Sequence, residues 1–428
     1  MIDDRSLSSL AQGLTGSEVL KIAGEVRALV AAGRSVTNLT VGDFSPKEFR
    51  IPPLLETLIA QNVANGETNY PPSDGTLELR KSVVELFRSE LGLTYPLEAT
   101  LIAGGSRPII YAAYAATVDR GDKVVYPTPS WNNNHYTYLV GGVPVELVVG
   151  AETNFMPTAD MIRPHVRDAR LIAVCTPLNP TGTVMAKDEV AAIANLVVEE
   201  NERRAKSGER ALFLLWDQVY WMLTFGENRH WTPPQVVPES AAYTIFVDGI
   251  SKAFASTGLR VGWTVAPPAV TARMRDIIGH MGAWAPKAEQ LAVAGFLHQK
   301  EDIAAYHDKM IRELRLRLDA LYEGLMAMRA EGLPVNAIAP QGAIYLSAQF
   351  NLIQRSKAAP DGARFGTNEA IRQFLLEEAG FAVVPFQAFG LKQEDGWFRL
   401  SAGAVSVRDC EEGLARVREA LVALLAAR

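Results

Sequence analysis

The sequence has very little cysteine. Among its 428 residues only Cys175 and Cys410 occur, and they lie far apart along the chain. Two distant thiols can build neither the disulfide framework of a small secreted domain nor the paired spacing of a structural zinc site. We therefore expect a protein of a reducing compartment, without a metal centre.

The chain also lacks a basic segment. Its 42 Lys and Arg residues are outnumbered by 48 Asp and Glu residues, which gives a formal net charge of −6 at pH 7. A nucleic-acid protein needs clustered cations to neutralise phosphates. Because no run in this sequence supplies them, no nucleic-acid partner is expected.

Long apolar runs are missing as well. No stretch reaches about 18 apolar residues, the length that crosses a bilayer, and even residues 101–118 contain Gly, Arg and Pro. The first twenty residues have an acidic start and no apolar segment of the kind found in secretory signals. These features predict a soluble, cytoplasmic protein without a membrane partner.

What the chain does have is length and alternation. A chain of 428 residues exceeds what one core usually supports, so two domains are expected. Short apolar runs alternate with helical patterns such as residues 76–91 and 187–205. This alternation predicts an α/β fold whose large domain has a mainly parallel seven-stranded sheet flanked by helices. The expected strands are residues 99–103, 123–126, 144–149, 170–175, 211–216, 243–247 and 262–266.

The pattern changes after about residue 300. One long amphipathic helix is expected over residues 301–328, followed by short strands and by helices at 367–379 and 407–427. This change indicates a smaller α+β domain, and the polar segment 356–364 is expected to be a surface loop. The predicted division is 1–50 as an N-terminal arm and part of the small domain, 51–300 as the large domain, and 301–428 as the C-terminal small domain.

Polar residues stand where the expected strands end. In open α/β sheets, ligands bind at the carboxyl ends of the strands. Taken singly, each residue has an ordinary explanation, such as a solvated lysine, a helix-capping carboxylate or a glycine turn. Together, on successive strand ends, they indicate one common ligand. They are the GGS turn at residues 104–106, Asn179 in CTPLNPTG, Asp217 after ALFLLW, Tyr220, Lys252 after YTIFVDG, and Arg260.

Pyridoxal 5′-phosphate would use all of these residues. The Lys252 amine can form an imine with it and then move protons. Asp217 beside the ring nitrogen keeps that nitrogen protonated, while a phenol and an amide can hydrogen-bond the ring oxygen. Arg260 and backbone amides at a helix N-terminus can hold the phosphate, and the aromatic face of Trp131 in TPSW can stack on the ring.

The segment SKAFASTGLRVGW, residues 251–263, is similar to the cofactor-lysine signature of the class I and II aminotransferases. The resemblance covers nearly the whole chain and implies the aspartate aminotransferase fold (fold type I), with pyridoxal phosphate as cofactor. It also implies a role for each matching residue: Lys252 as the imine lysine, Arg260 with Gly105 and Ser106 at the phosphate, Trp131 stacked on the ring, and Asn179, Asp217 and Tyr220 at the ring oxygen and ring nitrogen.

Three more residues match the family. Tyr70, in NYPPSDGTLELR, matches a tyrosine that reaches the phosphate of the neighbouring subunit, which implies a homodimer with shared active sites. Arg399, in WFRLS, matches the arginine that binds the substrate α-carboxylate, a task suited to a planar guanidinium. Gly42, in LTVGDF, matches a glycine near that carboxylate, and Asn179 is expected to help orient it.

The sequence departs from the family pattern near the phosphate. The family often has a serine three residues before the lysine, whereas this chain has Gly249, so Ser106 is a candidate for part of the missing contact. Some aspartate-specific relatives have a lysine at the position of Ser106. Arg107 follows, where the family often has a small residue, Glu or Gln; it is either a structural ion-pair partner or a residue of the pocket.

The segment HMGAWAPKAEQ corresponds to a loop that enters the partner's active site in relatives. No arginine for a distal carboxylate stands there, near His280. His280, Trp284 and Lys287 are candidates for substrate contact, but loop packing explains them nearly as well, and His135 is equally open. These departures argue against strict aspartate specificity. Aromatic residues that would suit a neutral or aromatic substrate are Phe44, Trp131 and Trp284.

The expected reaction is a ping-pong transfer of the amino group of an L-amino acid to a 2-oxo acid, with Lys252 as imine lysine and proton shuttle. A carbon–sulfur lyase, or another eliminating or decarboxylating enzyme, is the alternative on the same fold. A non-enzymatic regulatory module is less expected, because the N-terminal extension is too short for a helix-turn-helix domain and has no basic patch. The sequence does not indicate which donor and acceptor are used.

Overall fold

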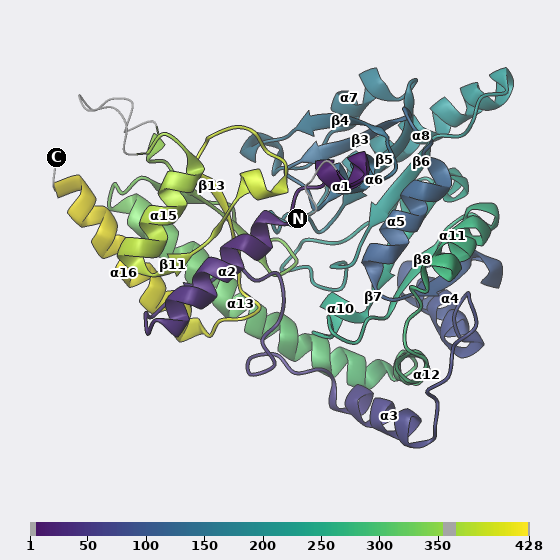
Figure 1. Ribbon diagram of the computed structural model, residues 1–428, viewed down its shortest axis with the longest axis horizontal. Coiled ribbons are helices and arrows are strands. Elements are labelled where there is room, and N and C mark those ends of the chain that lie inside the picture. The colour runs from purple at the N-terminus through teal and green to yellow at the C-terminus, as the bar shows by residue number, and fades with distance from the viewer. Residues whose placement is uncertain (1–5, 354–364, 427–428) are drawn as a thin grey trace.

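In a computed structural model, which describes residues 6–353 and 365–426, a seven-stranded sheet forms the centre of the larger part of the chain (Figure 1). The strand order is β2-β8-β7-β6-β5-β3-β4, and β8 alone runs antiparallel to its neighbours. The predicted mainly parallel sheet is confirmed, with each strand within two residues of its expected bounds. The strands are β2 Thr100–Ala103, β3 Lys123–Thr128, β4 Val143–Val148, β5 Ala169–Cys175, β6 Phe213–Asp217, β7 Thr244–Gly249 and β8 Gly262–Val265.

Helices cover both faces of this sheet, which is why its inner strands are apolar at successive positions. Every residue of β2, β5, β7 and β8 is buried. One face packs against α5 (Ser106–Thr117), α6 (Asn133–Leu139) and α11 (Pro268–Met281). The other face packs against α4 (Leu77–Leu91), α8 (Lys187–Ser207) and α12 (Lys287–Phe296).

A second, smaller group of elements comes mostly from the C-terminal part of the sequence. It contains an antiparallel sheet of order β12-β13-β10-β9, and the short strand β1 (Thr37–Asn38) pairs in parallel with β11. The smaller α+β part is therefore confirmed, while the residue boundaries of the domains stay a prediction. Its elements are α13 Lys300–Ala330, β9 Val335–Ala337, β10 Tyr345–Phe350, α15 Asn368–Ala379, β11 Phe381–Ala382, β12 Val384–Pro385, β13 Trp397–Ser401 and α16 Val407–Ala426.

The long helix α13 joins the two parts (Figure 1). Near its start, Ile303 and Tyr306 pack against the core of the large sheet. Further along, Leu314, Leu318 and Leu321 lie fully buried in the core of the smaller part, on the apolar face of the amphipathic helix that the sequence predicted. The expected loop at 356–364 lies outside the described residues.

The remaining elements are short or lie at the margins. The remaining helices are α1 Ser9–Gly13, α2 Glu18–Ala31, α3 Pro53–Ala64, α7 Ala159–Ile162, α9 Pro233–Val236 and α10 Ile250–Ala253, and 3₁₀ turns span Leu97–Ala99, Ala151–Thr153, Arg163–His165, Pro238–Ala242 and Phe386–Phe389.

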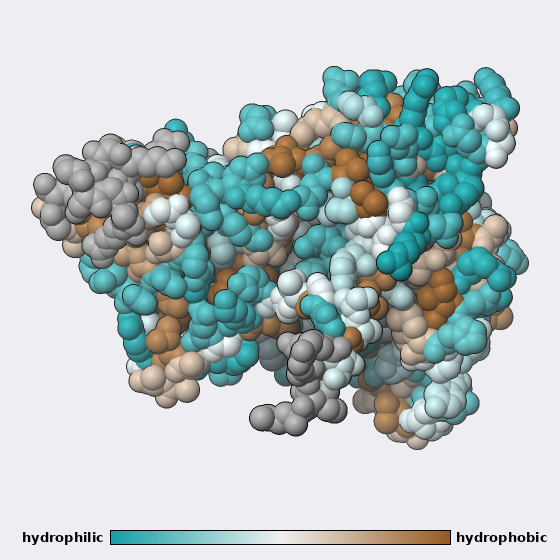
Figure 2. Space-filling model, turned by 45° about the horizontal axis from the view of Figure 1, so that its top comes forward, coloured by the Kyte–Doolittle hydropathy of each residue, from teal (hydrophilic) through white to brown (hydrophobic). Residues whose placement is uncertain are grey.

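The surface is mixed in character. On the face drawn in Figure 2, hydrophobic residues gather in patches between hydrophilic ones. Across residues 6–353 and 365–426, none of the helices combines the length and the hydropathy needed to cross a bilayer.

Candidate active site

The carboxyl ends of three neighbouring parallel strands form one edge of the large sheet. Cys175 ends β5 and pairs in register with Asp217, which ends β6. The next strand, β7, ends at Gly249 and continues directly into α10, which carries Lys252. The sheet topology thus brings Asp217 and Lys252 to the edge where open α/β sheets bind ligands.

Lys252 is partly buried at this edge of the sheet. Its Nζ donates to the carbonyl of Gly42 at 2.7 Å and lies 5.7 Å from the centre of the Tyr220 ring. Burial lowers the pKa of the Lys252 amine to about 8, with Asp43 opposing this change and Arg399 among the cations that reinforce it. A lysine with a lowered pKa supplies neutral, nucleophilic amine near physiological pH.

Asp217 is a buried carboxyl. Burial raises its pKa to about 7, against the N–H of Val219 and the charge of Lys252, which favour the ionised form. The Val219 N–H donates to its Oδ1 at 3.3 Å. A carboxyl in so dry a place gains strongly from a cation placed against it, and a protonated ring nitrogen is such a cation.

Arg260 and the start of α5 form a cradle for an anion. Arg260 has a left-handed backbone (φ 58°), and its guanidinium donates to the carbonyls of Thr257 and Gly104, both at 2.9 Å. Gly105 precedes the helix, and a Cβ there would lie 2.2 Å from Arg260 Nη2. No carboxylate pairs with Arg260 in the part of the chain that the structure describes. A guanidinium that lacks an ion-pair partner and lies beside helix N–H groups suits a phosphate.

Gly249 has a structural explanation. A Cβ at this position would lie 2.8 Å from Gly262 Cα and 2.8 Å from the Val261 carbonyl, so β8 leaves no room for a side chain. A Cβ on Gly262 would in turn lie 2.8 Å from the Ser106 backbone N. The serine found in many relatives cannot stand here without separating β7 from β8, and Ser106 stays the candidate for the phosphate contact.

Arg399 is a fully buried cation on β13. Its Nη1 donates to Asn179 Oδ1 at 3.1 Å and its Nη2 to the Thr40 carbonyl at 2.6 Å, while its buried Nε has no hydrogen-bond partner among the described residues. Gly42 lies beside it, and a Cβ there would be 3.3 Å from Nη1. The predicted trio of Gly42, Asn179 and Arg399 is thus brought together, with a guanidinium edge left for a carboxylate.

Tyr345 was not predicted from the sequence. Its hydroxyl lies 2.7 Å from that of Tyr220, and the Arg399 guanidinium lies 4.8 Å from the centre of its ring. The segment GAIYLS reads as an ordinary buried strand, so nothing in the sequence separated Tyr345 from the core residues around it. Phe389, whose ring also faces the Arg399 guanidinium at 4.8 Å, was missed for the same reason.

Arg107 and Trp131 lie together at the rim of the site. The Arg107 guanidinium is 5.2 Å from the centre of the Trp131 ring, and it helps to lower the pKa of Lys252. Over residues 6–353 and 365–426, no carboxylate forms an ion pair with Arg107. Among these residues Arg107 therefore has no partner for the structural ion pair that was one of its two interpretations. His135 is half-buried, and burial lowers its pKa.

Tyr70 is largely exposed to solvent. Its side chain is 83% exposed and meets Trp284 edge-on, with ring centres 5.5 Å apart. Lys287 pairs with Glu67 at 2.7 Å and with Asn69 at 2.8 Å, so it fixes the segment that carries Tyr70. These two contacts account for Lys287 without a role at the substrate. His280 is exposed near the end of α11.

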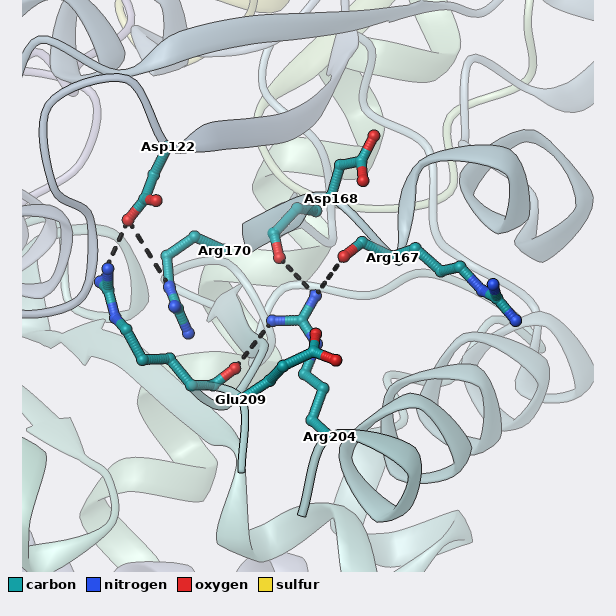
Figure 3. Close-up of a pocket in the computed structure, with 8 residues that line it drawn as sticks. Asp122, Arg167, Asp168, Arg170, Arg204 and Glu209 are labelled. Carbon is teal, nitrogen blue, oxygen red and sulfur yellow. Dashed lines mark hydrogen bonds and ion pairs between the residues drawn. The ribbon is translucent and has the colours of Figure 1, made fainter. Parts of the chain in front are cut away.

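A second polar hollow, of about 190 Å³, lies at the opposite end of the strands (Figure 3). Three of its four arginines pair with carboxylates, as Arg204 does with Glu200 at 2.7 Å and Arg210 with Asp122 at 3.1 Å. Arg204 also donates to the carbonyls of Val166 and Ala169, both at 2.7 Å. This cluster ties the end of α8 to the sheet, in contrast to the unpaired arginines at the carboxyl edge.

Comparisons with known proteins agree with this geometry. The family model described as aminotransferase class I and II matches residues 34–417. An aspartate aminotransferase of Rhizobium meliloti (strain 1021) is 29% identical over 406 residues, which cover 94% of this chain and 93% of the relative. An aspartate/prephenate aminotransferase of Thermus thermophilus is 31% identical over 391 residues, 90% and 93% of the two chains. The structure of aspartate aminotransferase from Thermus thermophilus with maleate superposes with a TM-score of 0.85 at 28% identity, covering 97% of this chain and 100% of that one.

Proposed function

The chain belongs to the class I and II aminotransferases, and we propose that the residues around Lys252 carry out its pyridoxal-phosphate-dependent transfer of an amino group from an L-amino acid to a 2-oxo acid. One observation carries this assignment. The Lys252 amine stands at the carboxyl edge of the sheet, within electrostatic reach of both the buried Asp217 carboxyl and the buried Arg399 guanidinium. Catalysis of this kind needs an amine, a ring-nitrogen partner and a carboxylate-binding group in one place.

The side chains present fit pyridoxal 5′-phosphate. Arg260 and the first turn of α5 offer donors to its phosphate, and Asp217 offers a carboxyl to its ring nitrogen. Trp131, half-buried beside Phe389, offers a ring face. When bound, this cofactor supplies a carbonyl carbon that condenses with amines and a ring that withdraws electrons from the substrate α-carbon.

Each side chain then has one task. Lys252, with its pKa lowered to about 8, acts as the nucleophile, and it then removes the α-proton of the donor amino acid and delivers a proton to the α-carbon that comes from the 2-oxo acid. Asp217, once ionised, keeps a proton on the ring nitrogen, and the Tyr220 hydroxyl donates to the ring oxygen. Arg399 and Asn179 orient the α-carboxylate, and the bare backbone of Gly42 leaves room for it.

Absorption spectra of the purified holoprotein test the reaction. Adding a single L-amino acid should convert the band of the Lys252-linked cofactor to that of the amine form, and a 2-oxo acid should restore it. Product that forms without any 2-oxo acid, while the original band persists, would indicate a lyase instead. The relatives are named as aminotransferases, and no observation on this chain favours the lyase.

For the substrate, we propose that acidic amino acids are among the donors, with Arg107 facing their second carboxylate. Two observations support this proposal. Arg107 lacks a carboxylate partner within the described residues although it lies at the rim of the site, and several relatives are named for aspartate. A cation left unpaired beside a ligand pocket gains most from an anionic ligand.

The substitution Arg107→Gln tests the substrate proposal. We expect kcat/KM for L-aspartate to fall by roughly 10- to 100-fold, the loss of one charge-assisted hydrogen bond, with little change for L-alanine. An equal fall for both substrates would mean that Arg107 supports Trp131 rather than the substrate, and preference for a neutral or aromatic donor would then regain support.

We also infer a homodimer and a cytoplasmic location. The dimer is supported by Tyr70, which is 83% exposed although it matches a residue that serves a neighbouring site. Exposed apolar side chains in the N-terminal segment, Leu7, Leu10, Leu14 and Leu20, suit a contact with a second copy. The cytoplasmic location is supported by Cys175 and Cys410, both free and buried.

A further inference from the structure

Two phenols from different parts of the fold meet at the candidate active site. Tyr220 follows strand β6 of the large sheet, and Tyr345 begins strand β10 of the smaller one. Their hydroxyl oxygens are 2.7 Å apart, and their rings meet edge-on with centres 5.6 Å apart. Tyr220 is 2% exposed and Tyr345 is fully buried. Such a short contact in a dry place is a strong, directional hydrogen bond.

The direction of this bond decides what Tyr220 can do. A phenol carries a single proton, so only one of the two hydroxyls donates to the other. If Tyr220 donates to Tyr345, no proton is left on Tyr220 for another acceptor. If Tyr345 donates to Tyr220, the Tyr220 proton is free to point at a ligand.

We propose that Tyr345 is a positioning residue whose hydroxyl donates to Tyr220, so that the Tyr220 proton is directed at the ring oxygen of the cofactor. This inference rests on the proposed function, in which Tyr220 serves that oxygen. Tyr345 itself touches no reacting atom and acts through Tyr220.

The surroundings of Tyr345 leave its hydroxyl little other choice. The Arg399 guanidinium lies over its ring at 4.8 Å, and Gly42 packs so closely that a Cβ there would lie 2.9 Å from Tyr345 Oη. No hydrogen-bond partner besides Tyr220 is found for this hydroxyl among the described residues. The same phenol therefore supports both the carboxylate-binding arginine and the ring-oxygen donor.

Charged and titratable groups face the pair from four elements. Arg399 approaches from β13, Cys175 from the end of β5, Asp43 from the segment after β1, and Lys252 from α10. Burial raises the pKa of both phenols, so neither ionises between pH 5 and 9. A pH effect of removing one hydroxyl is therefore transmitted to the cofactor rather than produced by the phenols' own titration.

The hydroxyl of Tyr345 should lower the pH at which the Lys252–cofactor linkage loses its proton. A hydroxyl that receives a hydrogen bond becomes a stronger donor. A stronger Tyr220 donor draws negative charge from the ring oxygen, so the neighbouring linkage holds its proton less tightly. Removing the Tyr345 hydroxyl should therefore raise the midpoint of the pH-dependent absorption change.

The experiment compares the holoprotein forms of four variants by absorption as a function of pH. Tyr220→Phe should raise the midpoint most, by about one pH unit or more, and Tyr345→Phe by roughly half a unit. The double variant should shift no further than Tyr220→Phe alone, because Tyr345 acts only through Tyr220. Tyr95→Phe is the matched control, since its hydroxyl is buried without a partner in the described chain and its ring packs against Phe87 and Phe246; it should leave the midpoint unchanged.

Two results would overturn the proposal: an unchanged midpoint in Tyr345→Phe, or a double variant whose shift is the sum of the single shifts. An unchanged midpoint in Tyr220→Phe would overturn the role of Tyr220 in the proposed function. This result is distinct from an unchanged midpoint in Tyr345→Phe alone, which would overturn only the role of Tyr345. If Tyr345→Phe does not fold, 3-fluorotyrosine at position 345 replaces it. Its more acidic hydroxyl is a stronger donor and should lower the midpoint, whereas a purely structural role predicts no change.

Discussion

Asp217 and Lys252 are titratable residues whose pKa values are shifted in opposite directions by burial. Burial raises the pKa of the Asp217 carboxyl to about 7 and lowers that of the Lys252 amine to about 8. Near physiological pH both groups of the cofactor-free protein are therefore within about one pH unit of their midpoints, so a bound ligand readily changes the protonation of either one. Each group becomes useful only when a ligand supplies its partner, as expected of a site whose chemistry depends on a cofactor.

The stability of the cofactor-free protein should depend on Asp217 in a definite direction. Below pH 3.8 the carboxyl is protonated in both the folded and the unfolded chain. Between pH 3.8 and about 7 it ionises only in the unfolded chain, so its contribution favours unfolding increasingly as the pH rises. Asn cannot ionise and therefore has no such effect. The difference in the free energy of unfolding, Asp217→Asn minus wild type, should be larger at pH 8 than at pH 5 by about 3 kcal/mol.

Urea unfolding of the two cofactor-free proteins at both pH values measures this difference. Lys252 is present in both proteins, so its own titration largely cancels in the comparison. A gap that stays constant with pH would show that the Asp217 carboxyl is not buried in a dry place. In the holoprotein the same substitution should weaken cofactor binding, because the ring nitrogen loses its carboxylate.

The residue pattern alone indicated the residues that stand at strand ends, whereas Arg399, inside β13, was predicted only from the family resemblance, and Tyr345 and Phe389 were missed. Lys252, Asp217 and Asn179 follow apolar runs, and this position is visible without any coordinates. Tyr345 and Phe389 belong to apolar segments that read as core. Only tertiary packing, which places their rings around Arg399, gives them another role.

At the scale of elements, glycines set the distance between β7, β8 and the start of α5. Gly249, Gly262 and Gly105 each face backbone or guanidinium atoms closer than a Cβ allows. Gly249, where the family often has serine, thus allows β7 to pack closely against β8. The sequence showed that the serine was absent, but the reason lies in a strand contact that no local pattern reveals.

Restoring the family residue should therefore harm this chain. Gly249→Ser must push against Gly262 Cα and the Val261 carbonyl, and we expect a loss of about 1–3 kcal/mol in the free energy of unfolding together with weaker cofactor binding. Gly279→Ser in α11, where an added Cβ would meet nothing within 4 Å, is the control for replacing a glycine by serine. Tighter cofactor binding by Gly249→Ser at unchanged stability would contradict this account.

At the scale of the whole molecule, the alternation of strands and helices was sufficient to predict the large sheet, because buried parallel strands are continuous apolar runs. The smaller part was harder to foresee. Its strand β1 comes from the N-terminal region and pairs with β11 more than 340 residues away (Thr37 with Phe381). Two-residue strands leave no periodic signal, so only the coarse α+β character of this part could be predicted.

The proposed dimer predicts shared sites. In light scattering the protein should have about twice the mass of one chain. Mixing inactive Lys252→Ala dimers with Tyr70→Ala dimers under conditions of subunit exchange should raise the activity, because each hybrid contains one site with an intact Lys252 and a partner's Tyr70. A monomeric mass, or no gain on mixing, would rule out sites completed by a second subunit.

In the proposed function, Lys252 holds the cofactor at the carboxyl edge of the sheet. The most direct measurement is borohydride reduction of the purified holoprotein, followed by proteolysis and mass spectrometry of the labelled peptides. The reduced cofactor should be found on the peptide that contains Lys252, and Lys252→Ala should carry no label. Label on a different lysine, or retention of full label and activity by Lys252→Ala, would contradict this role of Lys252.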